Sequence, residues 1–415
     1  MSHEELYEES LKYHQNPPGK IAVALTKPAE TAHDLSLAYS PGVAEPVRQI
    51  AKDPDNAYKY TSKGNSVAII SNGTAILGLG NLGPLASKPV MEGKAFLFKK
   101  FANIDAVDIE VKHKTVDEFI NTVENIADSF GGINLEDIKA PECFVIEREL
   151  IKRCNIPVFH DDQHGTAIVT CSGMLNACQI QGKKIEEARV VCVGAGAAGV
   201  ACMDLLLACG LKKENLFMCD RHGVIRSERD DLNGEKPRFI NDSGPKTLKE
   251  ALTGADILVG VSGPNLVSED EVMQMAPNAI IFACSNPEPE VSPELVKRVR
   301  PDIIMATGRS DYPNQINNVI CFPFLFRGTL DVRAKCINVE MMKAAMNAIR
   351  MLAQEPVPQK VVEAAEIDHL EFGKDYMIPK PMDPRLLKRV ARAVAQAAVD
   401  TGVAQLPMPE HYMED

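Results

Sequence analysis

A glycine-rich turn between an apolar strand and an apolar helix constrains the fold of this chain more than any other feature. The segment "ARVVCVGAGAAGVACMDLLLACG" contains a short strand, the spacing Gly194-x-Gly196-x-x-Gly199, and a helix that ends at Gly210. Three further apolar strands follow, "NLFMCD", "ADILVGVS" and "AIIFACS". Because these strands alternate with helical patterns, the sequence predicts a doubly wound parallel sheet with helices on both faces.

The same turn predicts a dinucleotide site of the Rossmann type. The first glycine permits a tight turn, the second lets the backbone approach a pyrophosphate, and the third allows the helix to pack closely on the strand. The helix N-terminus adds amide donors and positive potential. The alternative is a cluster of helix-packing glycines without a ligand. The predicted cofactor-binding residues of the turn are Gly194, Ala195, Gly196, Ala197, Ala198 and Gly199.

Asp220 ends the next apolar strand and bears on the choice of cofactor. Its distance from the glycines is close to that of the carboxylate that binds ribose hydroxyls in dinucleotide folds. Its charge favours NAD by repelling a 2′-phosphate, whereas the adjacent Arg221 could pair with one. The sequence therefore predicts NAD or NADP, with a preference for NAD.

Two pairs of adjacent carboxylates follow apolar segments that read as strands. Asp161 and Asp162 lie in "NIPVFHDDQHGTA", just before a predicted helix, and Glu136 and Asp137 lie in "INLEDIKAPECF". Open α/β sheets bind ligands beyond the carboxyl ends of their strands. Oxygen ligands without cysteine favour Mg²⁺ or Mn²⁺ over zinc. The alternative for each pair is a solvated turn, and the neighbouring histidines are expected to pack or to hold hydrogen bonds rather than to bind metal.

Lys94 and Tyr39 are candidates for proton transfer. Lys94 stands in "VMEGKAFLFKKF", between a glycine and an apolar run, where burial would lower its pKa toward the range of a general base. Tyr39 precedes Ser40-Pro41-Gly42, a rigid turn that would hold a phenol in place. Taken alone, Tyr39 is also compatible with a core or interface aromatic.

Composition excludes several other classes of protein. The 415 residues carry a net charge of −12 and no basic run, so we expect no nucleic-acid partner. No apolar run reaches the roughly 18 residues of a spanning helix, so we expect no membrane partner. The acidic start "MSHEELYEES" does not read as a secretory signal, and eleven cysteines without a C-x-x-C pair indicate a reducing compartment. We expect a cytoplasmic protein that acts on a small molecule.

The chain resembles the small-subunit malic enzymes of bacteria and some protists. The resemblance covers nearly the whole length and rests on eight segments in the family's order. These are "AYSPGVAEP", "ISNGTAILGLGNLG", "MEGKAFLFKKF", "INLEDIKAPECF", "FHDDQHGTA", "VGAGAAG", "SNPEPE" and "TGRSDYPNQINNVICFPF".

The resemblance implies oxidative decarboxylation of (S)-malate to pyruvate and CO₂, with reduction of NAD⁺ or NADP⁺ and dependence on Mg²⁺ or Mn²⁺. By the same resemblance, Lys94 is the base, Asp161 the carboxylate that tunes it, and Tyr39 the acid that protonates the enol. It also implies a homodimer. The implied metal ligands are Glu136, Asp137 and Asp162, and the implied amides for substrate and nicotinamide are Asn286, Asn317 and Asn318.

One departure from the wider family concerns substrate binding. The large-subunit enzymes carry a malate-gripping arginine just before "ILGLG", where this chain has Ala75. The anchor would then come from residues 71–74 or from a partner subunit. Two rival functions stay open at this stage: a metal-dependent oxaloacetate decarboxylase without net redox, and a dinucleotide sensor without catalysis.

The sequence predicts two α/β domains. The first, over residues 1–160, is an N-terminal α/β domain for substrate and metal, with short strands such as "DAVDIEV" between helices. The second, over residues 161–415, is a Rossmann-type domain whose C-terminal helices pack back on the rest of the chain. Two amphipathic helices are expected there, from Asn338 to about Ala353 and from Pro384 to about Thr401.

Overall fold

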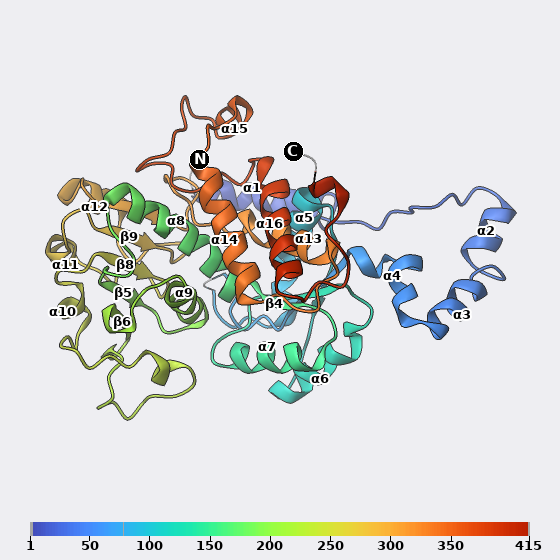
Figure 1. The fold of residues 1–415 in the computed structure, drawn as a ribbon, viewed down its shortest axis with the longest axis horizontal. Coiled ribbons are helices and arrows are strands. Elements are labelled where there is room, and N and C mark those ends of the chain that lie inside the picture. Colours follow the sequence, from blue (N-terminus) through green and yellow to red (C-terminus); the bar gives the residue numbers. More distant parts are fainter. Residues whose placement is uncertain (1–2, 78, 414–415) are drawn as a thin grey trace.

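The computed structural model describes residues 3–77 and 79–413, which form two parallel sheets with helices around them and an N-terminal arm that projects to one side (Figure 1). The α-helices are α1 (His3–Gln15), α2 (Ala32–Ala38), α3 (Ala44–Lys52), α4 (Ala57–Tyr60), α5 (Pro84–Ala102), α6 (Val116–Ala127), α7 (Glu142–Arg153), α8 (Thr166–Gln181), α9 (Ala197–Ala208), α10 (Leu248–Leu252), α11 (Glu269–Gln274), α12 (Pro293–Val299), α13 (Phe322–Asp331), α14 (Val339–Ala353), α15 (Gln359–Ala364) and α16 (Arg385–Asp400).

The first sheet has the strand order β2-β1-β3-β4, and all neighbouring strands are parallel. Since parallel strands end at the same edge, the residues that follow them meet there. Its central strand β1 is buried throughout. The strands are β1 (Ser66–Ser71), β2 (Asp105–Glu110), β3 (Gly132–Leu135) and β4 (Val158–His160).

The second sheet has the order β10-β9-β8-β5-β6-β7, with the first five strands parallel as predicted. The short edge strand β7 is antiparallel to β6, which the sequence did not predict. The chain reverses directly after β6 in a tight turn, where Gly223 has φ +95°. The strands are β5 (Val190–Val193), β6 (Leu216–Asp220), β7 (Gly223–Val224), β8 (Ile257–Gly260), β9 (Ile280–Ala283) and β10 (Ile304–Thr307).

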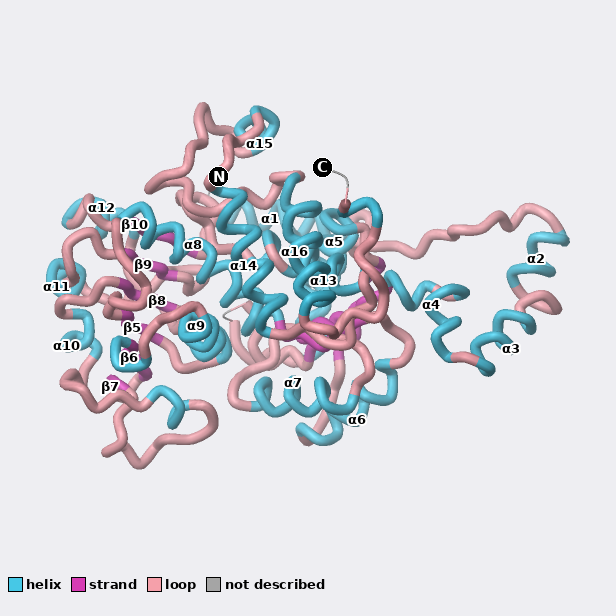
Figure 2. The backbone as a smooth tube through the Cα atoms, in the orientation of Figure 1, coloured by secondary structure: helices cyan, strands magenta, loops and turns pink. Residues whose placement is uncertain are grey.

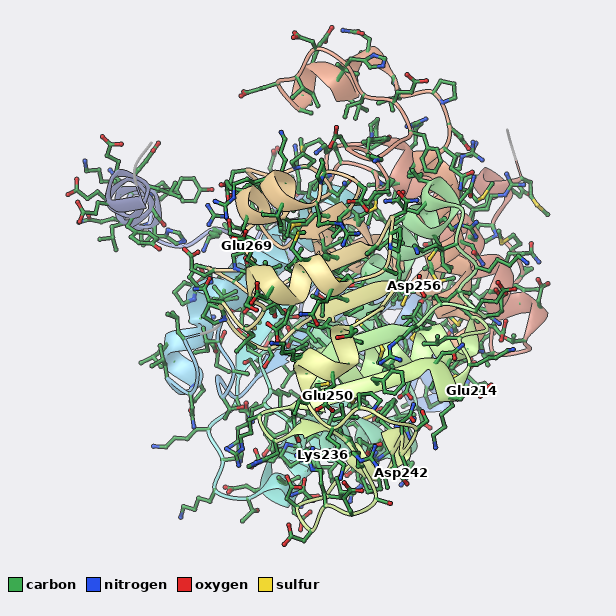
Figure 3. All side chains as sticks on the ribbon, turned by 90° about the vertical axis from the view of Figure 1, so that its left-hand side faces the viewer. Glu214, Lys236, Asp242, Glu250, Asp256 and Glu269 are labelled. Carbon is green, nitrogen blue, oxygen red and sulfur yellow. The ribbon has the colours of Figure 1, made fainter. Side chains whose placement is uncertain are left out.

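Both faces of this second sheet are buried, as the apolar strands predict. Val190 and Cys192 of β5 belong to the large core that includes α8 and α9, whereas Val191 and Val193 point into a smaller core with α10, α11 and α12. The alternation follows from the period of two along a strand. Figure 3 views this side of the molecule, where acidic side chains such as Glu214, Asp242, Glu250 and Glu269 lie on the surface.

The C-terminal helices return to the first sheet. Phe98 of α5 packs edge-on against Phe322 and Phe326 of α13, with ring centroids 4.8 and 5.3 Å apart. The two predicted amphipathic helices form as α14 and α16; α16 packs between α13 and α14 (Figure 1). The α/β fold class is therefore confirmed, while the boundary between residues 160 and 161 stays a prediction.

The N-terminal arm, which carries α2 and α3, lies apart from the two sheets (Figure 2). Figure 2 shows α2 and α3 at the end of an extended loop, well away from both sheets. Neither helix buries a side chain within the described residues. The described helices also include none that is both long and apolar enough to cross a membrane.

Candidate functional site

Four carboxylates converge at the carboxyl edge of the first sheet. Glu136 and Asp137 follow β3, and Asp161 and Asp162 follow the neighbouring strand β4. Glu136, Asp137 and Asp162 each offer an oxygen, and these oxygens lie within 4.8 Å of one another. The two predicted pairs thus form one cluster, which excludes the alternative of separate solvated turns.

Lys94 of α5 reaches into this cluster. Its Nζ lies 2.6 Å from Asp161 Oδ2 and 2.8 Å from Glu136 Oε1, and it stands 4.2 Å from the ring centroid of Phe322. The expectation of a lowered pKa is wrong for this state. Burial does act to lower the pKa of Lys94, but the charges of Asp161 and Glu136 outweigh it and raise the pKa above its ordinary value.

Burial and the neighbouring negative charges destabilise the ionised forms of Glu136 and Asp137. Burial raises the pKa of Glu136 well above its ordinary value, and the charges of Asp162 and Asp161 add to the effect. Burial and the charge of Asp162 raise the pKa of Asp137 to about 7. Asp137 Oδ2 is buried without a hydrogen-bond partner in the described part of the chain. Such a crowded set of hard oxygen donors fits a divalent cation, which would offset the repulsion.

A π-helical turn over Asp161–Gly165 carries two of the four carboxylates. Asp162 Oδ2 accepts a hydrogen bond from the Asp137 backbone N–H at 2.7 Å, which ties the turn to the end of β3. Glycine is needed at position 165, because a Cβ there would lie 1.7 Å from Asp161 Oδ1. Turns of this kind are found often at functional sites.

Glu147 of α7 is a buried residue of this site that the sequence analysis missed. Its carboxylate accepts hydrogen bonds from the backbone N–H of His160 and from Gln163 Nε2, and it lies 2.9 Å from His164 Nε2. His164 therefore holds a hydrogen bond, in line with its expected role. A signal was present: Glu147 occupies an apolar-face position of α7, beside Cys143, Ile146 and Leu150.

The three predicted amides lie in different settings. Asn318 Nδ2 donates to Asp161 Oδ2 at 3.2 Å, so Asn318 belongs to the cluster. The side chain of Asn317 instead accepts from the Val319 backbone N–H at 3.1 Å and caps its own short turn. Asn286 is exposed after β9, in the second sheet, and its Nδ2 packs against Gly308.

The glycine turn joins β5 to α9 in the second sheet, next to β8, where the strand order reverses. Gly194 has φ +119°, and a Cβ on Gly199 would lie 1.8 Å from the Gly194 carbonyl oxygen, so both positions require glycine. A Cβ on Gly196, by contrast, would meet open space at the N-terminus of α9. That opening leaves room for a ligand at the place where Rossmann folds hold a pyrophosphate.

Asp220 at the end of β6 is already neutralised by two cations. Arg229 Nη2 lies 2.7 Å and Lys236 Nζ 2.8 Å from Asp220 Oδ2. Although burial opposes it, these hydrogen bonds hold the pKa of Asp220 below its ordinary value. Arg221 instead donates to His222 at 3.0 Å on the exposed side of the strand end.

Tyr39 lies outside the cluster. It follows α2 on the arm, where 76% of the residue is exposed. Figure 1 shows α2 and α3 far from β4, whose end carries Asp161 and Asp162. The structure thus brings Lys94, Glu136, Asp137, Asp161, Asp162 and Asn318 together, and leaves Tyr39 apart from them.

Comparisons with known proteins agree with this arrangement. Residues 18–116 and 108–151 match the model "Malic enzyme, N-terminal domain", and residues 163–368 match "Malic enzyme, NAD binding domain". The chain is 64% identical to an NADP-dependent malic enzyme of Halomonas elongata, covering 97% of this chain and 96% of the relative. It is 55% identical to an NADP-dependent malic enzyme of Salmonella typhimurium, covering 98% of this chain but 54% of that protein.

A solved structure is similar over most of its length as well. The crystal structure of an NAD-dependent malic enzyme from Thermotoga maritima superimposes with a TM-score of 0.84 at 41% identity, covering 93% of this chain and 98% of that one. A Rossmann-type sheet beside a buried lysine–carboxylate cluster defines a dinucleotide-dependent oxidoreductase. The chain belongs to the malic enzyme family.

Proposed function

We propose that this protein oxidatively decarboxylates (S)-malate to pyruvate and CO₂ while reducing NADP⁺, with Mg²⁺ or Mn²⁺ at the carboxylate cluster. The observation that carries the proposal is the contact of Lys94 with Asp161 and Glu136, at 2.6 and 2.8 Å, inside that cluster. A lysine held between two buried carboxylates is placed to exchange a proton with a substrate hydroxyl.

The proposed metal ligands are Glu136, Asp137 and Asp162. Their support is the 4.8 Å cluster and the buried, unpartnered Oδ2 of Asp137. A Mg²⁺ or Mn²⁺ held by these residues would polarise the substrate's C2 oxygen and stabilise the negative charge that this oxygen gains when CO₂ departs.

Lys94 is the proposed base for the C2 hydroxyl. Its raised pKa keeps it protonated while both carboxylates face it. Lys94 serves as a base only in a state in which Glu136 pairs with another cation, since that removes one of the two charges that hold its proton. Asp161 then keeps the amine in place, and Asn318 fixes Asp161 through the hydrogen bond at 3.2 Å.

Asn317 and Asn286 are proposed to contact the substrate and the nicotinamide. Asn317 directly precedes Asn318, and Asn286 follows β9 at the carboxyl edge of the second sheet. Both therefore border the two edges between which a hydride would pass from substrate to cofactor. The residue that replaces the arginine absent at Ala75 is proposed to lie within residues 71–74 or on a partner.

We propose NADP⁺ rather than NAD⁺ for two reasons. The carboxylate of Asp220 is already paired with Arg229 and Lys236, so it repels a 2′-phosphate less than the sequence suggested. The two relatives above 50% identity described here are both named NADP-dependent. The Thermotoga enzyme is named NAD-dependent, so the preference for NAD⁺ drawn from the sequence stays a prediction to be measured in parallel.

The protein is proposed to work as a homodimer in which Tyr39 serves the site of the second copy. Tyr39, the proposed acid, lies on an arm whose apolar side chains Leu35, Leu37 and Val47 are exposed. The body exposes a matching set beside its site: Leu79, Leu82 and Leu85. That loop begins at Thr74 and Ala75, whose backbone N–H groups donate to the Asp137 carbonyl.

Exposed apolar side chains on both the arm and this loop favour contact with a partner. A second copy is favoured over a foreign chain because the carboxylate site on one chain would otherwise lack its acid. The arm of one copy would then deliver Tyr39 to the cluster of the other, through an exchange of identical elements.

The first test is nicotinamide absorbance in purified protein given malate and Mn²⁺, with NADP⁺ and NAD⁺ in parallel. We expect rapid reduction of NADP⁺. CO₂ release from oxaloacetate without any reduction of either cofactor with malate would support the decarboxylase instead. Dinucleotide binding without turnover of malate or oxaloacetate would support the sensor.

A further inference from the structure

Glu147 is a buried acid outside the proposed ligand set, and its hydrogen-bond partners lie next to that set along the chain. It lies on the inner side of α7, 6% exposed, among the apolar residues Cys143, Ile146 and Leu150. Burying a carboxylate costs free energy unless it is fully hydrogen-bonded. Its contacts must therefore account for its presence there.

All of its hydrogen bonds go to one short segment. The carboxylate accepts from the His160 backbone N–H at 3.1 Å and from Gln163 Nε2 at 3.1 Å. His164 Nε2 lies 2.9 Å from Oε1 and 3.0 Å from Oε2. His160 and Gln163 flank Asp161 and Asp162, so one carboxylate holds the chain on both sides of the two aspartates.

The ionisation state of Glu147 suits this role. Although burial opposes it, the charge and hydrogen bond of His164 lower the pKa of Glu147 below its ordinary value. An ionised carboxylate can only accept hydrogen bonds, so His164 Nε2 is the donor. Bonds of this charge-assisted kind are about twice as strong as neutral ones.

The turn needs a restraint from outside. In the π-helical geometry the Thr166 backbone N–H bonds the Asp161 carbonyl five residues back, a pattern that persists mainly where the surroundings hold it. Asp161 is fully buried, and its Oδ1 has no partner among the described residues. The side chain of Asp161 is therefore oriented from outside the turn, by Lys94 and Asn318 at Oδ2, and these contacts depend on the turn's backbone staying in place.

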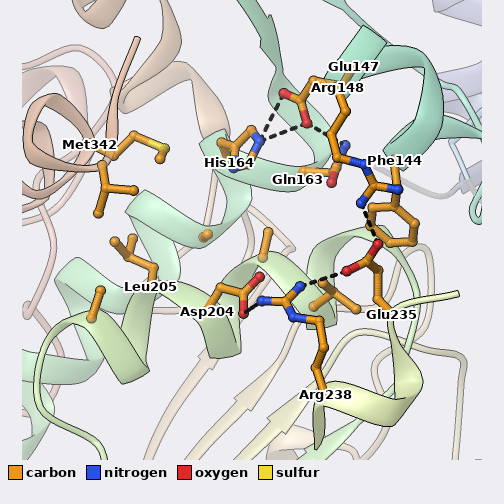
Figure 4. Close-up of a pocket in the computed structure, with 15 residues that line it drawn as sticks. Phe144, Glu147, Arg148, Gln163, His164, Asp204, Leu205, Glu235, Arg238 and Met342 are labelled. Atoms are coloured by element: carbon orange, nitrogen blue, oxygen red, sulfur yellow. Dashed lines mark hydrogen bonds and ion pairs between the residues drawn. The ribbon is translucent and has the colours of Figure 1, made fainter. Parts of the chain in front are cut away.

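The turn packs against α8 and α9, but the space on the side of Glu147 is only partly filled. A cavity of about 210 Å³ lies there, lined by Phe144, Leu205 and Met342 together with His164 and Gln163 (Figure 4). Ion pairs of Arg238 with Asp204 and Glu235 border it. Because this space is not filled by side chains, the turn could shift toward it if the hydrogen bonds to Glu147 were lost.

We propose that Glu147 is a positioning residue: by holding His160, Gln163 and His164 it fixes the turn so that Asp161 faces Lys94 and Asp162 faces Glu136 and Asp137. This rests on the proposed function for the identity of the metal ligands. Outer partners of this kind typically change metal affinity about 10–100-fold when they are replaced.

The test is Mn²⁺ binding by electron paramagnetic resonance, without malate or cofactor, on the full-length Glu147→Gln variant. Glutamine keeps the shape but replaces one acceptor oxygen with a donor. We expect the Mn²⁺ dissociation constant to rise about 10-fold while NADP⁺ binding is unchanged. Glu149→Gln, two residues along α7 and paired with Lys152 and Arg153 at the surface, is the matched control and should leave Mn²⁺ binding unchanged.

An Mn²⁺ dissociation constant within about twofold of wild type would overturn the proposal, whether or not thermal stability falls. If Glu147→Gln does not fold, Gln163→Met removes one of the three donors at similar volume and should shift the constant in the same direction by less. A wild-type protein that binds no Mn²⁺ would instead refute the proposed metal site, and with it this inference. The two failures are thus distinguished by the wild-type measurement.

Discussion

The cluster around Lys94 and the arm around Tyr39 supply two halves of one proposed reaction, yet they are built in opposite ways. Lys94 is enclosed by β3, the π-helical turn and α13, and its nearest neighbours are charged groups and Phe322. Tyr39 sits between two helices that bury nothing in the described structure. The cluster around Lys94 is buried within a single chain, whereas the helices on either side of Tyr39 expose their apolar side chains.

This difference favours the proposal that the apolar side chains of the arm are buried by a second copy of the chain. A segment that cannot bury its apolar face does not hold a fixed position by itself, since ordering a chain costs free energy that burial must offset. The arm nevertheless has well-formed helices, with a capping box at Thr31 and Asp34. Local capping stabilises the helices of the arm, and docking on a second copy would fix the position of the arm.

The largest effect is expected within the enclosed site. Asp162→Ala should abolish Mn²⁺ binding and lower kcat/KM for malate by more than about 100-fold, because it removes a proposed ligand. NADP⁺ binding, measured by fluorescence titration, should survive, since the glycine turn lies in the other sheet. The exposed Asp117→Ala serves as control; a Mn²⁺-binding Asp162→Ala variant would remove Asp162 from the ligand set.

The next prediction tests whether Tyr39 acts across the dimer. Lys94→Ala and Tyr39→Phe should each be nearly inactive alone. When the two are unfolded together, refolded and mixed, about one quarter of wild-type activity should return, because half of the dimers are mixed and each has one intact site. Mixing Lys94→Ala with Asp162→Ala is the control and should restore nothing, since both belong to the same enclosed site.

If Tyr39 reached the cluster of its own chain, no mixture would recover. The assay is initial rate of NADPH formation per subunit, with mixed-dimer formation checked by differently tagged copies. Recovery in the control mixture would show that residues of the enclosed site, and not only the arms, are shared between the two subunits.

The sequence predicted what is decided locally. The glycine turn, the apolar strands of the second sheet and the two C-terminal amphipathic helices depend on residues within a few positions of one another, and all formed as expected. The meeting of the four carboxylates could also be predicted, because residues that follow parallel strands of one sheet lie at the same edge. These features need no long-range information.

What the sequence could not give depends on distant contacts. The pKa of Lys94 is set by residues 42 and 67 positions away, Glu136 and Asp161, so burial alone predicted the wrong direction. The reversal into β7 is held by a distant contact, because the Val224 backbone N–H donates to the Lys246 carbonyl oxygen at 2.9 Å. The isolation of Tyr39 depends on a surface of the whole molecule, which no local pattern of the arm reveals.

Substitutions in the core and in the arm should change the free energy of unfolding to different extents. Phe98→Ala removes a fully buried ring that packs against Phe322 and Phe326, and should lower the free energy of unfolding by about 3–5 kcal/mol. Leu37→Ala, at 61% exposure on α2, should leave the unfolding of the body within about 0.5 kcal/mol of wild type. Urea unfolding followed by circular dichroism measures both.

The same Leu37→Ala variant should weaken the dimer instead, raising its dissociation constant about tenfold in sedimentation experiments. Met351→Ala, another exposed apolar residue but on α14, is the matched control. An unchanged dimer in Leu37→Ala would mean that the arm docks through other residues or does not dock.

The smallest expected effect concerns a second lysine–carboxylate group at the same edge of the first sheet. This group can be compared directly with the cluster around Lys94. Lys88 of α5 pairs with Asp108 and Glu110 at the end of β2, much as Lys94 pairs with Asp161 and Glu136. Lys88 is partly exposed, however, and Glu110 Oε1 is buried without a partner in the described residues. Burial and the neighbouring Asp108 raise the pKa of Glu110 to about 7.

Because the folded protein holds this proton more tightly than the unfolded chain, the contribution of Glu110 to stability is fully present below its ordinary pKa. It is lost as pH rises from about 4.5 to about 7. Glu110→Gln, which stays neutral, should remove that part of the pH dependence and raise the free energy of unfolding at pH 8 by about 1 kcal/mol. Urea titrations at several pH values measure it, with the exposed Glu187→Gln as control. A variant whose stability follows the wild-type pH course would show that Lys88 offsets the charge of Glu110 in the folded protein, and that Glu110 does not hold its proton more tightly there than in the unfolded chain.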